Sequence, residues 1–253
     1  RAGGEGGGDG KVSTVTAAAG TGIGFAVAKR CVEEGANVLV SDVHERRLGE
    51  AVERLRAIAP ERVHARSCDV TKQDDVDALV GTAIATLGHV DVLINNAGLG
   101  GTATIVEMTD AEWSRVIDVS LTSVMRMTRA ILPHMQARKT GAIVNNASVL
   151  GWRAQAGQAH YAAAKAGVMA LTRCAAIEAA PHGVRINAVA PSIAMHAFLA
   201  KTTTPELLAE LARREAFGRP AEVWEVANVM LFLASDLSTY LTGEVLSVSS
   251  QHP

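Results

Sequence analysis

The chain has 253 residues and carries 24 lysines and arginines against 26 aspartates and glutamates, a formal net charge of −2 at pH 7. This length fits one large α/β domain or two small ones, and the near-neutral charge offers no basic surface for nucleic acid. No apolar run approaches the roughly 20 residues of a membrane span. The three scattered cysteines give no disulfide framework, which favours a reducing, cytoplasmic setting.

The first ten residues, RAGGEGGGDG, lack the charged and then apolar plan of a signal peptide, and we expect residues 1–10 to form a flexible glycine-rich leader. From residue 12 onward, short apolar runs bounded by turn residues alternate with helix-like stretches. The runs expected to be strands are VSTVT (12–16), ANVLVSD (36–42), RVHARSCDV (62–70), VDVLINNAG (90–98), AIVNNAS (142–148), VRINAVAP (184–191) and EVLSVS (244–249).

Several of the helix-like stretches have recognisable start signals. Thr71 with Asp74, and Thr109 with Glu112, have the spacing of capping pairs, and the second pair is expected to open a long helix to about Ala137. Five further helices are expected. The first ends near Gly35, the second spans about 45–58, the third contains the YAAAK motif, the fourth starts at Thr204-Pro205 and the fifth covers about 222–234. This alternation predicts one Rossmann-like α/β domain over 11–253, with a doubly wound parallel sheet of about seven strands and helices on both faces.

A glycine-rich loop follows the first expected strand. In VTAAAGTGIG, Gly20, Gly22 and Gly24 stand where a strand passes into a helix. Glycines at such a junction allow a tight turn and let backbone N–H groups approach a pyrophosphate at the helix N-terminus. The loop therefore predicts dinucleotide binding.

Asp42 closes the second expected strand, eighteen residues after Gly24. A carboxylate there can accept hydrogen bonds from both ribose hydroxyls of the adenosine, which favours NAD and repels a 2′-phosphate. An aspartate that only caps a helix or lies in solvent would look the same in sequence. Arg46 and Arg47 lie close enough to reach a 2′-phosphate, so NADP stays possible.

Ser148, Tyr161 and Lys165 are the strongest candidates for catalysis. Tyr161 and Lys165 are four residues apart in an alanine-rich stretch, so a helix would place them on one face. A lysine ammonium beside a phenol favours the phenolate, and we expect it to lower the pKa of Tyr161 from about 10 toward neutrality. Ser148 is expected at the carboxyl end of the sheet, where open α/β folds bind ligands. The alternative is an ordinary helix with an incidental Tyr and Lys, because YxxxK alone is a weak signal.

Taken in chain order, these features resemble the short-chain dehydrogenase/reductase family over nearly all of residues 11–250. The matching segments are the glycine-rich loop, Cys68-Asp69-Val70, Asn95-Asn96-Ala97-Gly98, Ser148, Tyr161 with Lys165, Val189-Ala190-Pro191 and Tyr240-Leu241-Thr242-Gly243. The resemblance implies that Tyr161 donates or accepts the proton, that Lys165 holds the nicotinamide ribose, and that Ser148 hydrogen-bonds the reacting oxygen. The cofactor contacts that it implies are Gly20, Gly22, Ile23 and Gly24 at the pyrophosphate, Asp42 at the ribose, Asp69 and Val70 at the adenine, Asn96, Ala97 and Gly98 beside the cofactor, and Pro191 and Ala194 near the carboxamide.

The chain departs from the family pattern at four places. Alanines 17–19 replace the usual Thr-Gly opening of the loop, and Ser192 and His196 stand where Gly and Thr are common. Ser249-Ser250 replaces an Asp-Gly often seen near the end, which would alter subunit packing. Ser120 occupies the place of an Asn that holds a relay water. We expect its hydroxyl to keep a partial relay role, the alternative being a residue that only packs in its helix.

Residues 192–218 lie between the sixth strand and the next helix and are expected to form a lid over the active site. Apolar side chains there and just past Ser148 favour a bulky apolar substrate, although plain packing would give the same pattern. These residues are Trp152, Met195, Phe198, Leu199, Leu207 and Leu211. The chain is similar to actinobacterial family members that act on steroid- or acyl-CoA-derived substrates. The eight histidines show no metal-ligand spacing, so no metal site is expected.

The leading hypothesis is an NAD(P)-dependent oxidoreductase that interconverts a secondary alcohol and a ketone on a small-molecule substrate. An NADPH-dependent 3-oxoacyl thioester (acyl-carrier-protein) reductase is an alternative, and Asp42 counts against it. A non-catalytic dinucleotide-sensing scaffold is an alternative of another class, against which the intact Ser148, Tyr161 and Lys165 argue. The alanine-rich YAAAK helix and the methionine-rich helix before it offer surface for pairing, so we expect a homo-oligomer, either a dimer or a tetramer.

Overall fold

The computed structural model describes residues 10–15, 22–195, 199 and 204–251. The expected leader apart from Gly10, and the loop residue Gly20, lie outside the described residues. His196 and Phe198 of the expected lid also lie outside them.

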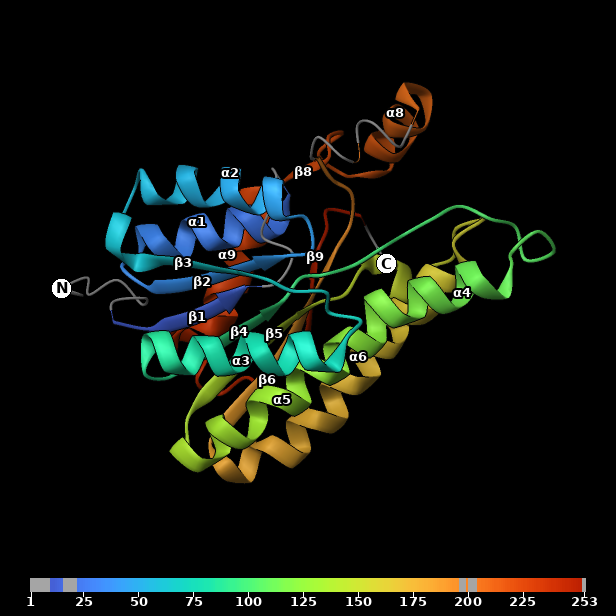
Figure 1. Cartoon of the computed structure of the whole chain (residues 1–253). Coiled ribbons are helices and arrows are strands. Elements are labelled where there is room, and N and C mark those ends of the chain that lie inside the picture. The colour runs from blue at the N-terminus through green and yellow to red at the C-terminus, as the bar shows by residue number, and fades with distance from the viewer. Residues whose placement is uncertain (1–9, 16–21, 196–198, 200–203, 252–253) are drawn as a thin grey trace.

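Seven parallel strands form one sheet in the order β3-β2-β1-β4-β5-β6-β9 (Figure 1). The strands are β1 (Val12–Val15), β2 (Asn37–Asp42), β3 (Val63–Ser67), β4 (Val92–Asn95), β5 (Gly141–Asn146), β6 (Val184–Pro191) and β9 (Val245–Val248). All seven expected strands are present. The strand order reverses between β1 and β4, the switch point at which open α/β sheets bind ligands.

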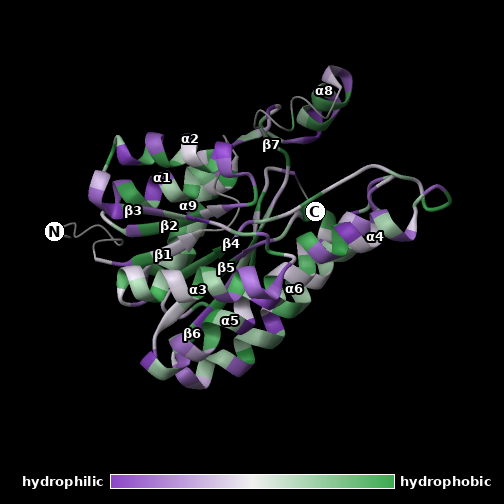
Figure 2. Cartoon of the chain, viewed as in Figure 1, coloured by the Kyte–Doolittle hydropathy of each residue, from purple (hydrophilic) through white to green (hydrophobic). Residues whose placement is uncertain are grey.

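Helices cover both faces of this sheet, as Figure 1 shows. One face carries α1 (Ile23–Glu33), α2 (Glu45–Arg56) and α9 (Val223–Ala234), and the other carries α3 (Gln73–Leu87), α5 (Ser123–Arg138) and α6 (Ala159–Ala179). Successive strand residues point to opposite faces. Val38 and Val40 therefore join the first core and Leu39 joins the second. Figure 2 shows hydrophobic strands between helices whose outer faces are hydrophilic. The predicted fold class is confirmed.

The helix expected from Thr109 to about Ala137 is built in three pieces. Thr109 and Glu112 form the predicted capping box, in which the Thr109 N–H donates to Glu112 at 2.9 Å. From this cap, α4 (Asp110–Ile117) passes through a π-helical turn, Asp118–Thr122, into α5. Short π-helical turns occur often at functional sites. The described residues also form 3₁₀ turns at Pro60–Arg62, Val149–Gly151, Ala180–His182 and Asp236–Ser238.

The predicted Thr71–Asp74 cap is wrong. Lys72 is the N-cap residue of α3 and makes no side-chain cap. The Thr71 hydroxyl instead donates to Asp69 Oδ1 at 2.6 Å, and the Thr71 N–H donates to the same oxygen at 3.0 Å. An aspartate two residues away closes its own turn, and this local bond competes with helix capping.

An arm leaves the sheet after β6. It begins at β7 (Ala194–Met195), which pairs with β8 (Ala221–Glu222), and it carries α8 (Pro205–Arg214). As predicted, α8 starts with a proline, and the Thr204 hydroxyl accepts the Leu207 N–H at 3.3 Å. No residue of α8 is buried, and Figure 1 shows this helix standing away from the sheet. Within the described parts of the chain, no helix is both long and apolar enough to cross a membrane.

Candidate active site

The three predicted catalytic side chains meet at the carboxyl ends of the central strands. Ser148 follows β5, and Tyr161 and Lys165 stand one turn apart near the start of α6. Tyr161 and Ser148 share a side-chain hydrogen bond. The Lys165 ammonium lies 5.5 Å from the centroid of the Tyr161 ring. The structure thus brings all three residues together.

Lys165 is deeply buried, with 2% of its surface exposed. Its Nζ donates to the backbone carbonyl of Asn146 at 2.6 Å. Burial lowers the pKa of Lys165 from 10.5 to about 8, because a side chain removed from water resists carrying a charge. Gly98 adjoins this ammonium, since a Cβ at that position would lie in contact with Nζ at 3.4 Å.

The expected fall in the pKa of Tyr161 is wrong. Burial raises the pKa of Tyr161 to about 12, and the hydrogen bond with Ser148 offsets only part of that rise. Lys165 directs its hydrogen bond to the Asn146 carbonyl and lies over the ring rather than at the phenol oxygen. The phenol is therefore protonated at neutral pH, which is the form that can donate a proton.

Ser148 is fixed by the turn that follows it. It lies two residues after β5 in an extended conformation and is 9% exposed. Its Oγ accepts the Leu150 N–H at 3.2 Å, which caps the 3₁₀ turn Val149–Gly151. This bond uses one acceptor position of the hydroxyl and leaves its proton available for a neighbouring oxygen.

Asn145 and Asn146 are site residues that sequence reasoning missed. Asn95 Nδ2 donates to Asn145 Oδ1 at 2.9 Å, and Asn146 Nδ2 donates to Asn96 Oδ1 at 2.9 Å. The first pair lies in register across β4 and β5. Asn146 also holds Lys165 through its carbonyl. The sequence contained the signal, because both Asn-Asn doublets end apolar runs that form neighbouring strands.

Ser120 lies in the π-helical turn and is fully buried. Its Oγ donates to the Leu99 carbonyl and accepts the Leu99 N–H, each at 2.8 Å. A Cβ placed on Gly98 would lie 3.9 Å from this Oγ and 3.4 Å from Lys165 Nζ, so the serine and the lysine flank the same glycine. The single hydroxyl proton of Ser120 is engaged with Leu99, and one acceptor lone pair is left for a water.

The predicted phosphate and ribose residues that the structure describes lie along the same edge of the sheet. Gly22 is the N-cap of α1 and supplies no side-chain cap, so the N–H groups of Ile23 and Gly24 begin a turn suited to a phosphate. Asp42 ends β2, and its Oδ1 accepts the His44 N–H at 2.9 Å. Asp42 therefore caps the turn into α2. A carboxylate has about four acceptor sites, so Asp42 can accept from more than one donor.

The remaining predicted cofactor residues follow their strands. Asp69 and Val70 come after β3, where the hydrogen bonds from Thr71 hold the pKa of the Asp69 carboxyl below its usual range. Val70 packs against the core beneath α3 and α5. Of the other five, Asn96, Ala97 and Gly98 follow β4 and Pro191 ends β6. Ala194 opens β7 and is buried.

Comparison with known proteins decides the family. The sequence model described as enoyl-(acyl carrier protein) reductase matches residues 17–250. The chain belongs to the short-chain dehydrogenase/reductase family.

Similar members of the family cover nearly the whole chain. A (5R,7aS)-5-hydroxy-7a-methyl-1-oxo-2,3,5,6,7,7a-hexahydro-1H-indene-carboxyl-CoA reductase of Mycobacterium tuberculosis is 65% identical over 246 residues, which are 97% of this chain and 94% of that protein. A 3-oxoacyl-(acyl-carrier-protein) reductase of Thermotoga maritima is 38% identical over 248 residues, 95% of this chain and 96% of that protein. The crystal structure of a short chain dehydrogenase from Mycobacterium smegmatis is 57% identical, has a TM-score of 0.87 and covers 98% of this chain and 95% of that chain.

As a short-chain dehydrogenase/reductase, the chain is an oxidoreductase of a family that uses NAD(P) as its cofactor. Its residues fit such a cofactor. Asn146 Oδ1 and Ser192 Oγ are buried polar atoms with no hydrogen-bond partner in the described residues, and they stand at the ends of β5 and β6. Unsatisfied buried polar atoms suit the hydroxyls and amide of a nicotinamide riboside. The described residues contain no cluster of three or more His, Cys, Asp or Glu side chains that could hold a metal ion.

Proposed function

We propose that this enzyme interconverts a ketone and a secondary alcohol on a bulky apolar ring system carried as a coenzyme A thioester. The observation that carries the proposal is the 65% identity, along 97% of the chain, to a reductase named for a hydroxy-oxo-hexahydroindene-carboxyl-CoA. Trp152, which is 53% exposed just past Ser148, adds apolar surface beside the predicted site. Leu207 and Leu211 on α8 add apolar surface on the arm.

In the proposed mechanism, Tyr161 carries the proton. Its phenol is protonated at neutral pH, donates to the ketone oxygen during reduction and takes the proton back during oxidation. Ser148 hydrogen-bonds the same oxygen and stabilises the charge that develops there. Bound NAD(H) supplies or accepts the hydride. Lys165, held by Asn146, is charged below about pH 8 and stabilises the phenolate that forms beside it.

We assign NAD rather than NADP as the preferred cofactor. Asp42 ends β2 at the ribose position of the family, and its charge repels a 2′-phosphate. Arg46, one of the two arginines that kept NADP possible, is paired with Glu50 at 2.5 Å on an exposed face.

Asp42→Ala is expected to weaken NADH binding roughly tenfold and to narrow the preference for NADH over NADPH, because charged hydrogen bonds to the ribose are lost and the repulsion is removed. Fluorescence titration of both cofactors measures the two dissociation constants. Arg46→Ala is the matched control and should leave their ratio unchanged. An unchanged ratio in Asp42→Ala would remove Asp42 from the site.

Ser120→Ala is expected to slow the chemical step and leave NADH affinity nearly unchanged, because the variant loses the hydroxyl that can hold a relay water beside Lys165. Single-turnover rates measured across pH test this. Ser123→Ala is the matched control, since the Ser123 hydroxyl is buried nearby and donates to Val119 O at 2.6 Å without touching Leu99. If Ser120→Ala and the wild type have the same pH profile and differ by under about twofold, Ser120 is a packing residue only.

A screen of NADH and NADPH oxidation at 340 nm tests the proposed substrate. Its substrates are a bicyclic oxo-carboxyl-CoA, a linear 3-oxoacyl-CoA, a linear 3-oxoacyl carrier protein and a simple cyclic ketone. We expect NADH and the bicyclic thioester to give the highest kcat/KM. Faster turnover of the linear carrier-protein thioester with NADPH would support the 3-oxoacyl reductase alternative instead.

The hypothesis of a non-catalytic dinucleotide-sensing scaffold is set aside, because the family is one of oxidoreductases and Ser148, Tyr161 and Lys165 lie together in one site.

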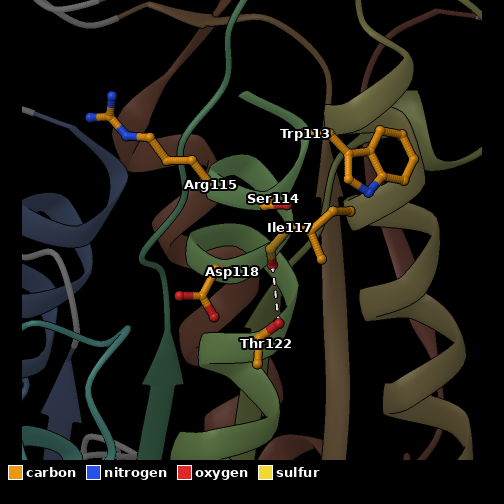
Figure 3. A pocket seen from close by; sticks show the side chains of 6 residues that line it. All are labelled: Trp113, Ser114, Arg115, Ile117, Asp118 and Thr122. Carbon is orange, nitrogen blue, oxygen red and sulfur yellow. Dashed lines mark hydrogen bonds between the residues drawn. The ribbon is translucent and has the colours of Figure 1, made fainter. Parts of the chain in front are cut away.

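We also propose a homo-oligomer, because large apolar side chains are exposed on helices and on turns between them. They are Ile105, Val106, Trp113, Ile177, Trp224, Leu237 and Tyr240. A shallow groove of about 450 Å³ runs along α4, and Figure 3 shows Trp113 on its α6 side and Arg115 on the opposite side. Met127 and Met135 are buried in the chain's own core, so they do not form the contact surface expected of them. Light scattering at micromolar concentration should give a dimer or tetramer, and a monomer would contradict the proposal.

A further inference from the structure

Three segments that are distant in sequence meet beside the arm. The first is the tail 249–251, which follows β9 and emerges at the same edge of the parallel sheet as the site. The second is Glu215, the residue directly after α8. The third is Arg153, five residues past Ser148. Their side chains form one connected hydrogen-bond network, which we call the tail latch: Arg153, Glu215, Ser250 and Gln251.

Glu215 is the acceptor at the centre of the tail latch. Only 4% of its surface is exposed. The Ser250 N–H and the Ser250 hydroxyl donate to its Oε2 at 3.0 and 2.8 Å, and Gln251 Nε2 donates to its Oε1 at 2.7 Å. The Ala216 N–H returns a bond to the Ser250 carbonyl at 3.1 Å. A buried carboxylate needs such donors, so the end of the arm is bound firmly to the tail.

Gln251 joins this carboxylate to a cation. Arg153 Nη1 donates to Gln251 Oε1, and Nη2 approaches the Gln251 backbone carbonyl at 3.4 Å. The amide of Gln251 therefore accepts from Arg153 with its oxygen and donates to Glu215 with its nitrogen. A planar amide placed between a guanidinium and a carboxylate satisfies both and fixes their separation.

The tail latch connects the arm to the loop that carries Ser148. No residue of α8 is fully buried, and Leu208, Leu211 and Ala212 are only half-buried, so apolar packing alone holds this helix weakly. The pair of β7 and β8 ties the base of the arm, and the latch ties the end of α8. Trp152, beside Arg153, and Leu211, near the end of α8, are the apolar groups whose spacing the latch would fix.

We propose that Arg153, Glu215 and Gln251 are positioning residues that hold the α8 arm at a set distance from the catalytic loop and so determine affinity for a bulky substrate. The inference rests on the proposed function only in taking the bulky thioester as the substrate that reaches the arm. The three residues act through α8 and Trp152, not on the reacting oxygen.

Gln251→Ala removes the bridge and tests this role. The expected result is a rise of about tenfold in KM for the bicyclic oxo-carboxyl-CoA with little change in kcat, because the lost contacts position the remote part of the substrate. The KM for a simple cyclic ketone and the dissociation constant for NADH should stay within about twofold. An equal rise in KM for both ketones, or a change confined to kcat, would overturn the proposal.

Exchanging the side chains of Glu215 and Gln251 tests whether the hydrogen-bond network itself sets the KM. Gln251→Glu alone places two carboxylates together, and Glu215→Gln alone removes the charge that faces Arg153 through the amide. The double variant Glu215→Gln/Gln251→Glu restores one carboxylate, one amide and every donor–acceptor pair, with the carboxylate now beside Arg153. It should recover most of the wild-type KM. A double variant no better than the worse single variant would contradict a specific latch.

The position of the arm can be measured without any substrate. Arg213 and Arg214 are exposed on α8, so the initial rate of tryptic cleavage there reports how firmly the arm is held. The rate should rise in Gln251→Ala, fall back in the exchanged variant, and stay at the wild-type value in Glu210→Gln, which breaks only the Arg214–Glu210 ion pair on the same helix. Unchanged proteolysis in Gln251→Ala would refute the latch. Changed proteolysis with no turnover of any CoA thioester by the wild type would refute the proposed substrate alone.

Discussion

Tyr161→Phe is expected to lower kcat by roughly 100- to 10,000-fold, the range typical of a lost general acid or base, and to leave NADH affinity within about twofold. The substitution removes one oxygen atom from a buried ring and keeps the packing of that ring. Tyr161 is hydrogen-bonded to Ser148 and adjoins Lys165, so its hydroxyl is the proton donor of the proposed mechanism. Stopped-flow single turnovers with saturating NADH measure the chemical step directly.

The chain provides its own control for this variant, because it has only two tyrosines. Tyr240 is fully exposed. Tyr240→Phe should keep the wild-type rate, and both variants should unfold at nearly the wild-type temperature. If Tyr161→Phe retained more than half of the wild-type rate, the assignment of Tyr161 as proton donor would be wrong.

The architecture was readable from the sequence because local signals and tertiary structure agree. Seven short apolar runs became the seven strands of the main sheet, and Thr109 with Glu112 formed the capping box that their spacing predicts. The Thr71–Asp74 cap failed because Asp69 offered the Thr71 hydroxyl a nearer acceptor. A spacing rule for capping does not register such a competitor.

The site was predicted less completely than the fold. Helical spacing placed Tyr161 and Lys165 on one face, but it carried no information on the depth of burial that raises the pKa of one and lowers that of the other. The support from Asn146 depends on where the end of β5 lies relative to α6, which no local pattern specifies. The tail latch joins Arg153 and Gln251, which are 98 positions apart in the chain. No local sequence pattern predicts such a contact.

Lys165→Met combines a loss of function with a gain in stability. We expect kcat/KM to fall at least about 100-fold, because no cation remains to stabilise the phenolate of Tyr161. We also expect the variant to be more stable than the wild type at pH 7. Methionine has a similar length and no charge, so replacing the buried ammonium removes its desolvation penalty.

The size and the pH dependence of that gain follow from the pKa of Lys165. Burial lowers this pKa from 10.5 to about 8, so folding the charged lysine costs about 3 kcal/mol at pH 7. The lost hydrogen bond to Asn146 offsets about 1 kcal/mol, which leaves a gain of about 2 kcal/mol for the variant. Between about pH 8 and pH 10.5 the unfolded wild type binds more protons than the folded protein, so its free energy of unfolding rises with pH. The stability difference between variant and wild type should therefore shrink through this window.

Urea unfolding of both proteins at pH 7, 8, 9 and 10 measures the difference. The raised pKa of Tyr161, about 12, has little effect below pH 10 and is common to both proteins. Lys139→Met, at an exposed position, is the control and should show no pH-dependent difference from the wild type. Two results would contradict this prediction: a variant less stable than the wild type at pH 7, or a stability difference that does not change from pH 7 to pH 10. Either would show that the buried Lys165 ammonium does not lower the free energy of unfolding. Together with a loss of turnover, the predicted result would show that the chain keeps a destabilising buried charge for its chemistry.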